Sequence, residues 1–267
     1  MFKAVFIDMD GTLLRNDHTI SSVNKQAIER LLVKNIMVVP VSARPLHGIM
    51  PIIQDVIPPT MPIVSLNGSY IFFNNEILFQ VAIELPDAVG LHNELQHYDA
   101  SMMYYSQMEW FSASDDQLVK KEQRITPIKI KIQPFDVTLK EWQAQQAGPN
   151  KILIAAPNNI IAIIEDRLLE LYGASLNIYK SQPTYLEVMN MEASKPKAIK
   201  FLLKKYGFEQ QDIIAIGDNY NDKGMIEFAG IGVAMGNAPA EIKDIADYVT
   251  DTNMNDGVAK ALNHFFP

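Results

Sequence analysis

Short apolar runs and helix-period segments alternate at the start of the chain. The runs 4–7, 36–41 and 61–68 are rich in Val and Ile, which is typical of strands buried on both faces of a sheet. A helix that begins at Ser21 or Ser22 separates the first two runs, and a second apolar helix precedes the third. This order of strands and helices predicts a parallel sheet with helices on both faces.

The pattern changes after the third run. A hairpin is predicted about Asn74 and Asn75, and the block 84–189 then shows helices between strands whose polarity alternates. Strands of this kind pair mostly in the antiparallel direction, so the block is predicted to be a separate α+β module. Its predicted strands are 101–113, 127–132, 151–156, 176–180 and 184–189.

The first pattern returns near the C-terminus, with a helix over 195–207 and a buried strand over 212–218. Two further strands, "IGVAM" and "DYVT", and a closing helix, "GVAKALNHFF", follow. We therefore predict one α/β domain made of residues 1–83 and 190–267, interrupted by an inserted α+β domain, 84–189. An insertion between two halves of one sheet also predicts a lid that gates a site on that sheet.

Composition narrows the classes of function. The chain has 267 residues, 48% of them hydrophobic, and a formal net charge of -8. This charge argues against a nucleic-acid partner, which requires a basic face. There are no cysteines, which excludes disulfides and thiolate chemistry, and no apolar stretch approaches the length of a membrane helix. We expect a cytoplasmic protein with no membrane partner, either a monomer or a small homo-oligomer.

Polar side chains gather where the predicted parallel strands end. In an open parallel sheet these carboxyl ends share one edge, and ligands bind there. Two carboxylates one residue apart, in "DMDGTL", repel each other and require a positive charge nearby. The candidate residues at this edge are Asp8, Asp10, Ser42, Arg44, Lys195, Asp218, Asn221 and Asp222.

These residue types suit phosphoryl transfer. Asp8 and Asp218 offer the hard oxygen ligands that Mg²⁺ prefers. Ser42, expected at a helix N-terminus, and Lys195 offer a cradle for a phosphate. Arg44 has two equal readings, since it could touch the substrate or pair with a carboxylate.

The motifs "DMDGTL", "SAR", "SKPKAIKFL" and "GDNYND" occur in the order of the four motifs of the haloacid dehalogenase-like (HAD) superfamily, which this chain resembles. The runs "GVAMGNAPAEIKDIADYVT" and "DGVAKAL" are similar to its Cof-type, subfamily IIB phosphatases. The resemblance covers essentially the whole chain. It implies a Rossmann-like core with a cap of type C2, inserted after the second motif.

The resemblance also implies a role for each candidate residue. Asp8 would be the nucleophile that forms an aspartyl-phosphate, and Asp10 the general acid and then the base for water. Mg²⁺ would be held by the Asp8 side chain, the Asp10 backbone carbonyl and Asp218. Phosphoryl oxygens would be held by Ser42 and Lys195. The supporting residues of the last loop would be Asn221, for phosphate, and Asp222, for the metal.

We therefore expect a Mg²⁺-dependent phosphatase that acts on small phosphorylated metabolites, such as sugar phosphates or a phosphorylated cofactor. The alternatives are a phosphotransferase or mutase of the same fold, and a catalytically silent ligand-binding protein. Asn67 and Gly68 could form a plain turn or face the site. The scattered histidines, such as His92 and His97, are expected at the surface. The run "MMYYSQMEWF" is expected to be sheet core rather than a stacking platform.

Overall fold

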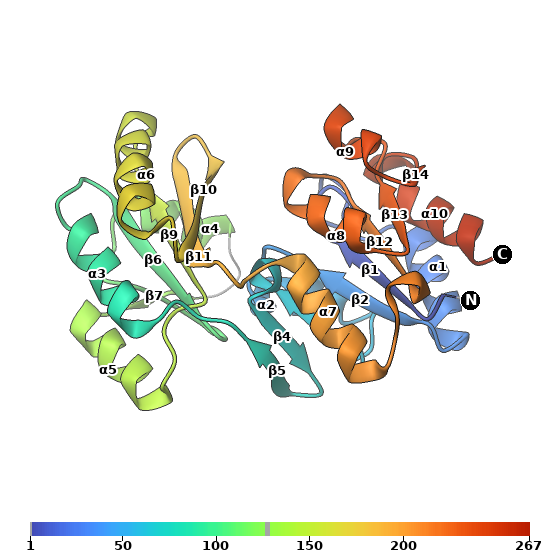
Figure 1. Cartoon of the computed structure of the whole chain (residues 1–267), viewed down its shortest axis with the longest axis horizontal. Coiled ribbons are helices and arrows are strands. Elements are labelled where there is room, and N and C mark those ends of the chain that lie inside the picture. The colour runs from blue at the N-terminus through green and yellow to red at the C-terminus, as the bar shows by residue number, and fades with distance from the viewer. Residues whose placement is uncertain (1, 126–128) are drawn as a thin grey trace. The chain divides into compact units, whose positions relative to one another are not determined.

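The computed structural model describes residues 2–125 and 129–267, and it contains two compact units (Figure 1). The first unit comprises the chain up to Arg44, Ile49–Phe79 and Ser194–Pro267. The second comprises Pro45–Gly48 and Gln80–Ala193. The boundaries predicted from the sequence for the inserted domain remain a prediction.

The first unit is built on an eight-stranded sheet with the strand order β14-β13-β12-β1-β2-β3-β4-β5. The strands from β14 to β3 are parallel, and β4 continues the edge in the antiparallel direction. The strands are β1 (Ala4–Asp8), β2 (Met37–Val41), β3 (Ile63–Ser65), β4 (Tyr70–Phe73), β5 (Glu76–Gln80), β12 (Ile213–Gly217), β13 (Ile231–Ala234) and β14 (Tyr248–Val249).

Helices pack on this sheet because the central strands are apolar throughout. Phe6 and Val39 share one apolar cluster with Ile199 and Leu202, which lie on the buried face of α7. The helices of this unit are α1 (Ser22–Val33), the part of α2 (Leu46–Ile53) from Ile49 onward, α7 (Lys195–Tyr206), α8 (Lys223–Phe228), α9 (Ala240–Asp244) and α10 (Gly257–Phe265). Its short 3₁₀ turns are η1 (Leu66–Gly68), η2 (Gln210–Asp212), η3 (Tyr220–Asp222) and η4 (Asn253–Asn255).

Local signals placed two helix ends correctly. Ser21 is the N-cap of α1, and its hydroxyl accepts a hydrogen bond from the Asn24 amide. Gly207 ends α7 in the left-handed conformation, with a φ of 67°. The prediction that Ser42 lies at a helix N-terminus was wrong, because α2 begins only at Leu46. The Ser42 hydroxyl instead accepts a hydrogen bond from the Arg44 amide in the loop before the helix.

The second unit contains a six-stranded sheet with the order β10-β11-β9-β6-β7-β8. Its pairs are antiparallel except for β7 and β8. The strands are β6 (Ser101–Ser106), β7 (Glu109–Ser112), β8 (Lys131–Ile132), β9 (Lys151–Ala155), β10 (Leu176–Gln182) and β11 (Tyr185–Asn190). The helices are α3 (Leu85–Leu95), α4 (Gln117–Ile125), α5 (Phe135–Gln145) and α6 (Asn158–Tyr172). The predicted α/β class with an α+β insertion is confirmed. The strand predicted over 127–132 corresponds to β8 (Lys131–Ile132), and the predicted residues 127 and 128 lie outside the described ones.

The run "MMYYSQMEWF" forms the β6–β7 hairpin and is sheet core, as predicted. Tyr104 and Phe111 face the helix-covered core, where both rings contact Trp142 edge-on. On the opposite face Tyr105 stacks on Trp110 with ring centroids 5.5 Å apart. In the ranges 2–125 and 129–267, no helix combines the length and apolar character needed to cross a membrane.

His92 corrects one expectation from the sequence. It is buried rather than exposed, and its ring stacks on Phe135 with centroids 3.6 Å apart. Its Nδ1 lies 2.7 Å from the Tyr104 hydroxyl. Burial lowers the pKa of His92 below its usual value, because the protonated ring loses solvation.

Candidate active site

The site lies where the order of the strands in the first sheet reverses. The chain moves from β1 to β2 and β3 on one side and returns to β12 on the other. Asp8 is the last residue of β1, and Asp218 directly follows β12. Because adjacent parallel strands end at the same edge, the two carboxylates face a common point at this switch.

Lys195 is the positive charge that this edge requires. It is the first residue of α7 and directly follows the N-cap Ser194, whose side chain accepts from the Lys197 amide. The Lys195 side chain is 1% exposed. Its Nζ lies 2.5 Å from Asp8 Oδ1 and 2.5 Å from Asp222 Oδ1. A buried ammonium therefore bridges the end of β1 and the 3₁₀ turn η3, which follows the neighbouring strand β12.

The ionisation of this cluster is strongly coupled. Burial, followed by the charge of Asp222, raises the pKa of Asp8 well above its usual value, although Lys195 opposes the rise. Burial alone would lower the pKa of Lys195, but the charges of Asp222 and Asp8 outweigh it and raise that pKa. Burial also raises the pKa of Asp218 to about 6, against the lowering effect of a hydrogen bond from Thr12.

A cation fits this set of donors. Ligand oxygens of Asp8, Asp218 and Asp222 all lie within 4.8 Å of one another. Within this cluster one ammonium, that of Lys195, is paired with Asp8 and Asp222, and Asp218 adds a third carboxylate. Hard oxygen ligands in this number suit a divalent ion that keeps part of its water shell.

Two residues that the sequence analysis did not single out orient Asp218. The Thr12 hydroxyl donates to Asp218 Oδ1 at 2.8 Å. Asn237 Nδ2 lies 3.4 Å from Asp218 Oδ2 and donates to the Gly11 carbonyl at 2.8 Å. Both residues stand inside quoted motifs, "DMDGTL" and "GVAMGNAP", so their position in a motif was the available signal.

Gly11 shows how closely the chain passes Asp218. Its φ is +80°, and a Cβ there would lie 2.3 Å from Asp218 Oδ2. A side chain at this position would therefore be strained in its backbone and would displace the carboxylate.

Asp222 fixes the loop after β12. Its side chain is fully buried, and its Oδ2 accepts from the backbone amides of Asp218 at 2.9 Å and Asn219 at 3.1 Å. Its other oxygen binds Lys195. Asn219 caps η3 by accepting from the Tyr220 amide.

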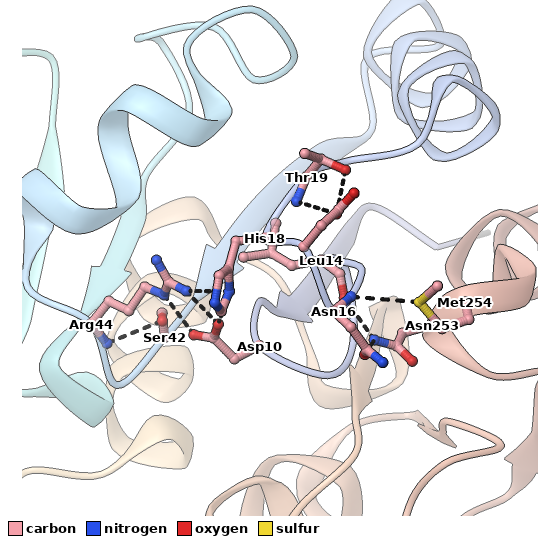
Figure 2. A network of polar contacts seen from close by, with 10 residues as sticks. Asp10, Leu14, Asn16, His18, Thr19, Ser42, Arg44, Asn253 and Met254 are labelled. Atoms are coloured by element: carbon pink, nitrogen blue, oxygen red, sulfur yellow. Dashed lines mark hydrogen bonds and ion pairs between the residues drawn. The ribbon is translucent and has the colours of Figure 1, made fainter. Parts of the chain in front are cut away.

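Asp10 belongs to a second, more exposed cluster (Figure 2). Arg44 donates hydrogen bonds to both Asp10 oxygens, from Nε to Oδ2 at 2.7 Å and from Nη2 to Oδ1 at 2.6 Å. The same Nη lies 3.0 Å from His18 Nδ1. Of the two readings of Arg44, the structure shows the pairing with a carboxylate.

Ser42 and Asn221 are joined through a residue between them in space. The Ser42 carbonyl accepts from the Asn67 amide at 2.9 Å, and Asn67 Oδ1 accepts from Asn221 Nδ2 at 3.3 Å. The residues predicted from the sequence thus form three groups: the buried cluster around Lys195, the Asp10–Arg44 pair, and the Ser42–Asn67–Asn221 chain.

Comparisons with known proteins show the family of this chain. The family model of the haloacid dehalogenase-like hydrolases matches residues 5–262. A Haemophilus influenzae protein whose name places it among the phosphatases is 38% identical over 100% of this chain and 99% of its own. The Bacillus subtilis protein 5-amino-6-(5-phospho-D-ribitylamino)uracil phosphatase YcsE is 29% identical over 98% of this chain and 95% of its own.

Solved structures show the same fold. A haloacid dehalogenase-like hydrolase from Bacteroides thetaiotaomicron superposes with a TM-score of 0.90 and 30% identity, over 100% of both chains. The subclass IIB sugar phosphatase BT4131 gives a TM-score of 0.81 and 25% identity over 98% of both chains. With the motifs and the fold in agreement, this chain belongs to the haloacid dehalogenase-like hydrolases, as a phosphatase of the Cof type.

Proposed function

We propose that this phosphatase hydrolyses monoesters of small phosphorylated metabolites in a Mg²⁺-dependent reaction, with Asp8 as the nucleophile. The observation that carries the proposal is the buried Asp8–Lys195–Asp222 cluster beside Asp218. A carboxylate needs no base to become a nucleophile, but it must approach an anionic phosphate. Lys195, together with a cation bound by the carboxylates, would offset that repulsion.

Mg²⁺ would be held by the carboxylates of Asp8 and Asp218 and by the Asp10 backbone carbonyl, with Asp222 in support. The close approach of the carboxylate oxygens supports this assignment. When bound, the ion supplies neutralisation of the charge on the phosphoryl oxygens. The family generally uses a divalent metal, and the choice of Mg²⁺ is our proposal.

Lys195 has two roles in this scheme. An ammonium carries three donors, and two of them hold Asp8 and Asp222. The third is assigned to a phosphoryl oxygen, with the Ser42 hydroxyl and the Asn221 amide as the other phosphate contacts. Lys195 therefore orients the nucleophile and binds its target at the same time.

The reaction follows in two steps. Asp8 attacks phosphorus, the bond between phosphorus and the ester oxygen breaks, and Asp10 gives its proton to that oxygen. Asp10 then takes a proton from a water molecule that attacks phosphorus, which releases inorganic phosphate and restores Asp8. Arg44 holds the Asp10 carboxylate from both oxygens and so limits the directions in which it can point.

The substrate class rests on the relatives. One acts on a sugar phosphate and another on a phosphorylated ribitylaminouracil, according to their names. A phosphorylated polyol or sugar is common to both, and we propose that class for this chain. Selection among such substrates is assigned to the inserted residues 84–189.

The decisive experiment measures phosphate release from a panel of sugar phosphates, the phosphorylated ribitylaminouracil and p-nitrophenyl phosphate. Release that needs added Mg²⁺ after EDTA treatment supports the proposal, and full activity after exhaustive EDTA contradicts the metal assignment. The Asp8→Asn variant serves as the control for contaminating phosphatase. Phosphoryl transfer to an added alcohol that exceeds release to water would favour the phosphotransferase alternative, and no turnover at all would favour a silent binding protein.

A further inference from the structure

The loop between β3 and β4 has an unusual backbone. Leu66, Asn67 and Gly68 are consecutive and all have positive φ, at 48°, 52° and 93°. Glycine and asparagine tolerate this region, but a buried leucine is a conformational outlier there. Such strain persists only where the surroundings impose it, and it is concentrated at functional sites.

Backbone hydrogen bonds tie this loop to the segment that carries Ser42. The Asn67 amide donates to the Ser42 carbonyl at 2.9 Å, and the Leu66 amide donates to the Arg44 carbonyl at 3.1 Å. The hydroxyl of Ser65 donates to the same Arg44 carbonyl at 2.8 Å. Three hydrogen bonds therefore hold the loop against the turn after β2.

The other side of the loop packs against the start of α7. A Cβ on Gly68 would lie 2.3 Å from the Ser194 carbonyl oxygen and 2.8 Å from the Lys195 amide nitrogen. Both neighbours are backbone atoms, which cannot move aside as a flexible side chain can. The left-handed turn thus lets the loop approach the helix that presents Lys195.

The Asn67 side chain completes the set of contacts. It is 9% exposed, and its Oδ1 accepts from Asn221 Nδ2 at 3.3 Å. Asn221 lies on η3 and Asn67 in η1, so this bond joins two loops that are far apart in the sequence. This hydrogen bond restrains the orientation of the Asn221 amide.

We propose that Asn67 is a positioning residue for phosphate binding, acting through the amide of Asn221 and held by the strained turn 66–68. The inference rests on the proposed function, in which Asn221 and Ser42 contact the phosphoryl group. A plain turn residue would have no effect on phosphate affinity.

The central test is the Asn67→Gly variant, because glycine keeps the left-handed backbone and removes only the amide. The matched control is Asn35→Gly, at an exposed residue with a φ of 58° in the turn after α1. Binding of inorganic phosphate in the presence of Mg²⁺ is measured by calorimetry. We expect Kd to rise about 3- to 10-fold in Asn67→Gly, as for one lost hydrogen bond, and to stay unchanged in Asn35→Gly.

A double-mutant cycle with Asn221→Ala identifies the route. If Asn67 acts through Asn221, adding Asn67→Gly to Asn221→Ala changes Kd little further. Fully additive effects would overturn the proposed route, and an unchanged Kd in Asn67→Gly would overturn the positioning role. A lower melting temperature with an unchanged Kd would show a structural role only, which also overturns the proposal.

A second variant covers the case in which Asn67→Gly does not fold. Asn67→Ala removes the same amide but keeps a Cβ, so Kd should rise about 3- to 10-fold, as in Asn67→Gly. Wild-type affinity in this variant would contradict the proposal. Binding is measured separately from turnover, so continued turnover in Asp8→Asn would defeat the proposed nucleophile without deciding the role of Asn67.

Discussion

The candidate active site contains a buried and an exposed cluster of carboxylate and cation, and the two differ mainly in burial. In the buried cluster Lys195 and Asp222 have side chains 1% and 0% exposed. In the exposed cluster the Asp10 and His18 side chains are 45% and 66% exposed, with Arg44 between them. Both hold a carboxylate that we assign to the reaction.

The difference in burial predicts different effects of substitutions on stability in the two clusters. Removing one partner of a buried ion pair leaves an uncompensated charge in a poorly solvated place, which lowers stability as well as activity. An exposed pair contributes little to stability because water and salt replace the lost partner. Variants of the buried cluster should therefore affect folding and turnover, whereas variants of the exposed cluster should affect turnover alone.

The largest expected effect is that of Asp8→Asn. An amide cannot form the acyl-phosphate, so turnover should fall to background for every substrate, including p-nitrophenyl phosphate. Rapid-quench measurement of alcohol release checks this, since the variant should show no burst. A burst of wild-type size would remove Asp8 from the role of nucleophile.

Lys195→Ala should follow. We expect turnover to fall severely and the free energy of unfolding to fall by about 3–5 kcal/mol, because Asp8 and Asp222 are left buried without their cation. The expected loss of stability follows from the burial of the Lys195 side chain.

Urea titration and steady-state kinetics measure the two effects of Lys195→Ala. The matched control is Lys223→Ala, which removes an exposed lysine of α8 whose partner is Glu227. It should leave both quantities near those of the wild type. A stable Lys195→Ala variant would contradict the contrast between the two clusters.

Asp10→Asn should lower turnover without lowering stability. General acid catalysis typically contributes about 10²–10⁴-fold, so esters with poor leaving groups should lose that much. The defect in the first step should shrink for p-nitrophenyl phosphate, whose leaving group needs no proton. An equal loss for all leaving groups in that step would show that Asp10 is not the acid.

Arg44→Lys should have a smaller effect. A lysine keeps the charge but cannot grip both Asp10 oxygens, and losing one such bond should reduce turnover of poor leaving groups about 2- to 10-fold. Thermal unfolding should be unchanged. The comparable change Arg30→Lys, at an exposed arginine that contacts Asn263, should alter neither. A loss of stability in Arg44→Lys but not in Arg30→Lys would contradict the expectation that the exposed cluster contributes little to stability.

The smallest expected effect applies the same burial argument to His92. A pKa lowered in the folded state means that the unfolded chain binds more protons, so stability is present above the usual histidine pKa of about 6.5 and is lost as pH falls through the lowered folded value. Thermal unfolding at several pH values should show a shallower acid decline in His92→Gln. His97→Gln, at an exposed histidine on the same unit, should keep the wild-type decline.

Local sequence determined much of the fold, and most of the candidate site residues could be predicted from it. The central strands are visible as apolar runs because both faces of a parallel sheet are buried. Ser21, Ser194 and Gly207 act at helix ends, where the relevant hydrogen bonds lie within a few residues. Site residues could be named because they sit in short motifs at the ends of strands, and the topology brings those ends to one edge.

The tertiary structure decided which groups meet. Lys195 contacts Asp8 across 187 positions of the sequence, and no local pattern indicates that its ammonium is buried between two carboxylates. The same holds for Thr12 and Asn237 beside Asp218, and for the contact of Asn67 with Asn221. Local propensity fixes backbone conformation, whereas the partner of a side chain and the solvation of its charge depend on residues that only the packing of distant segments brings close.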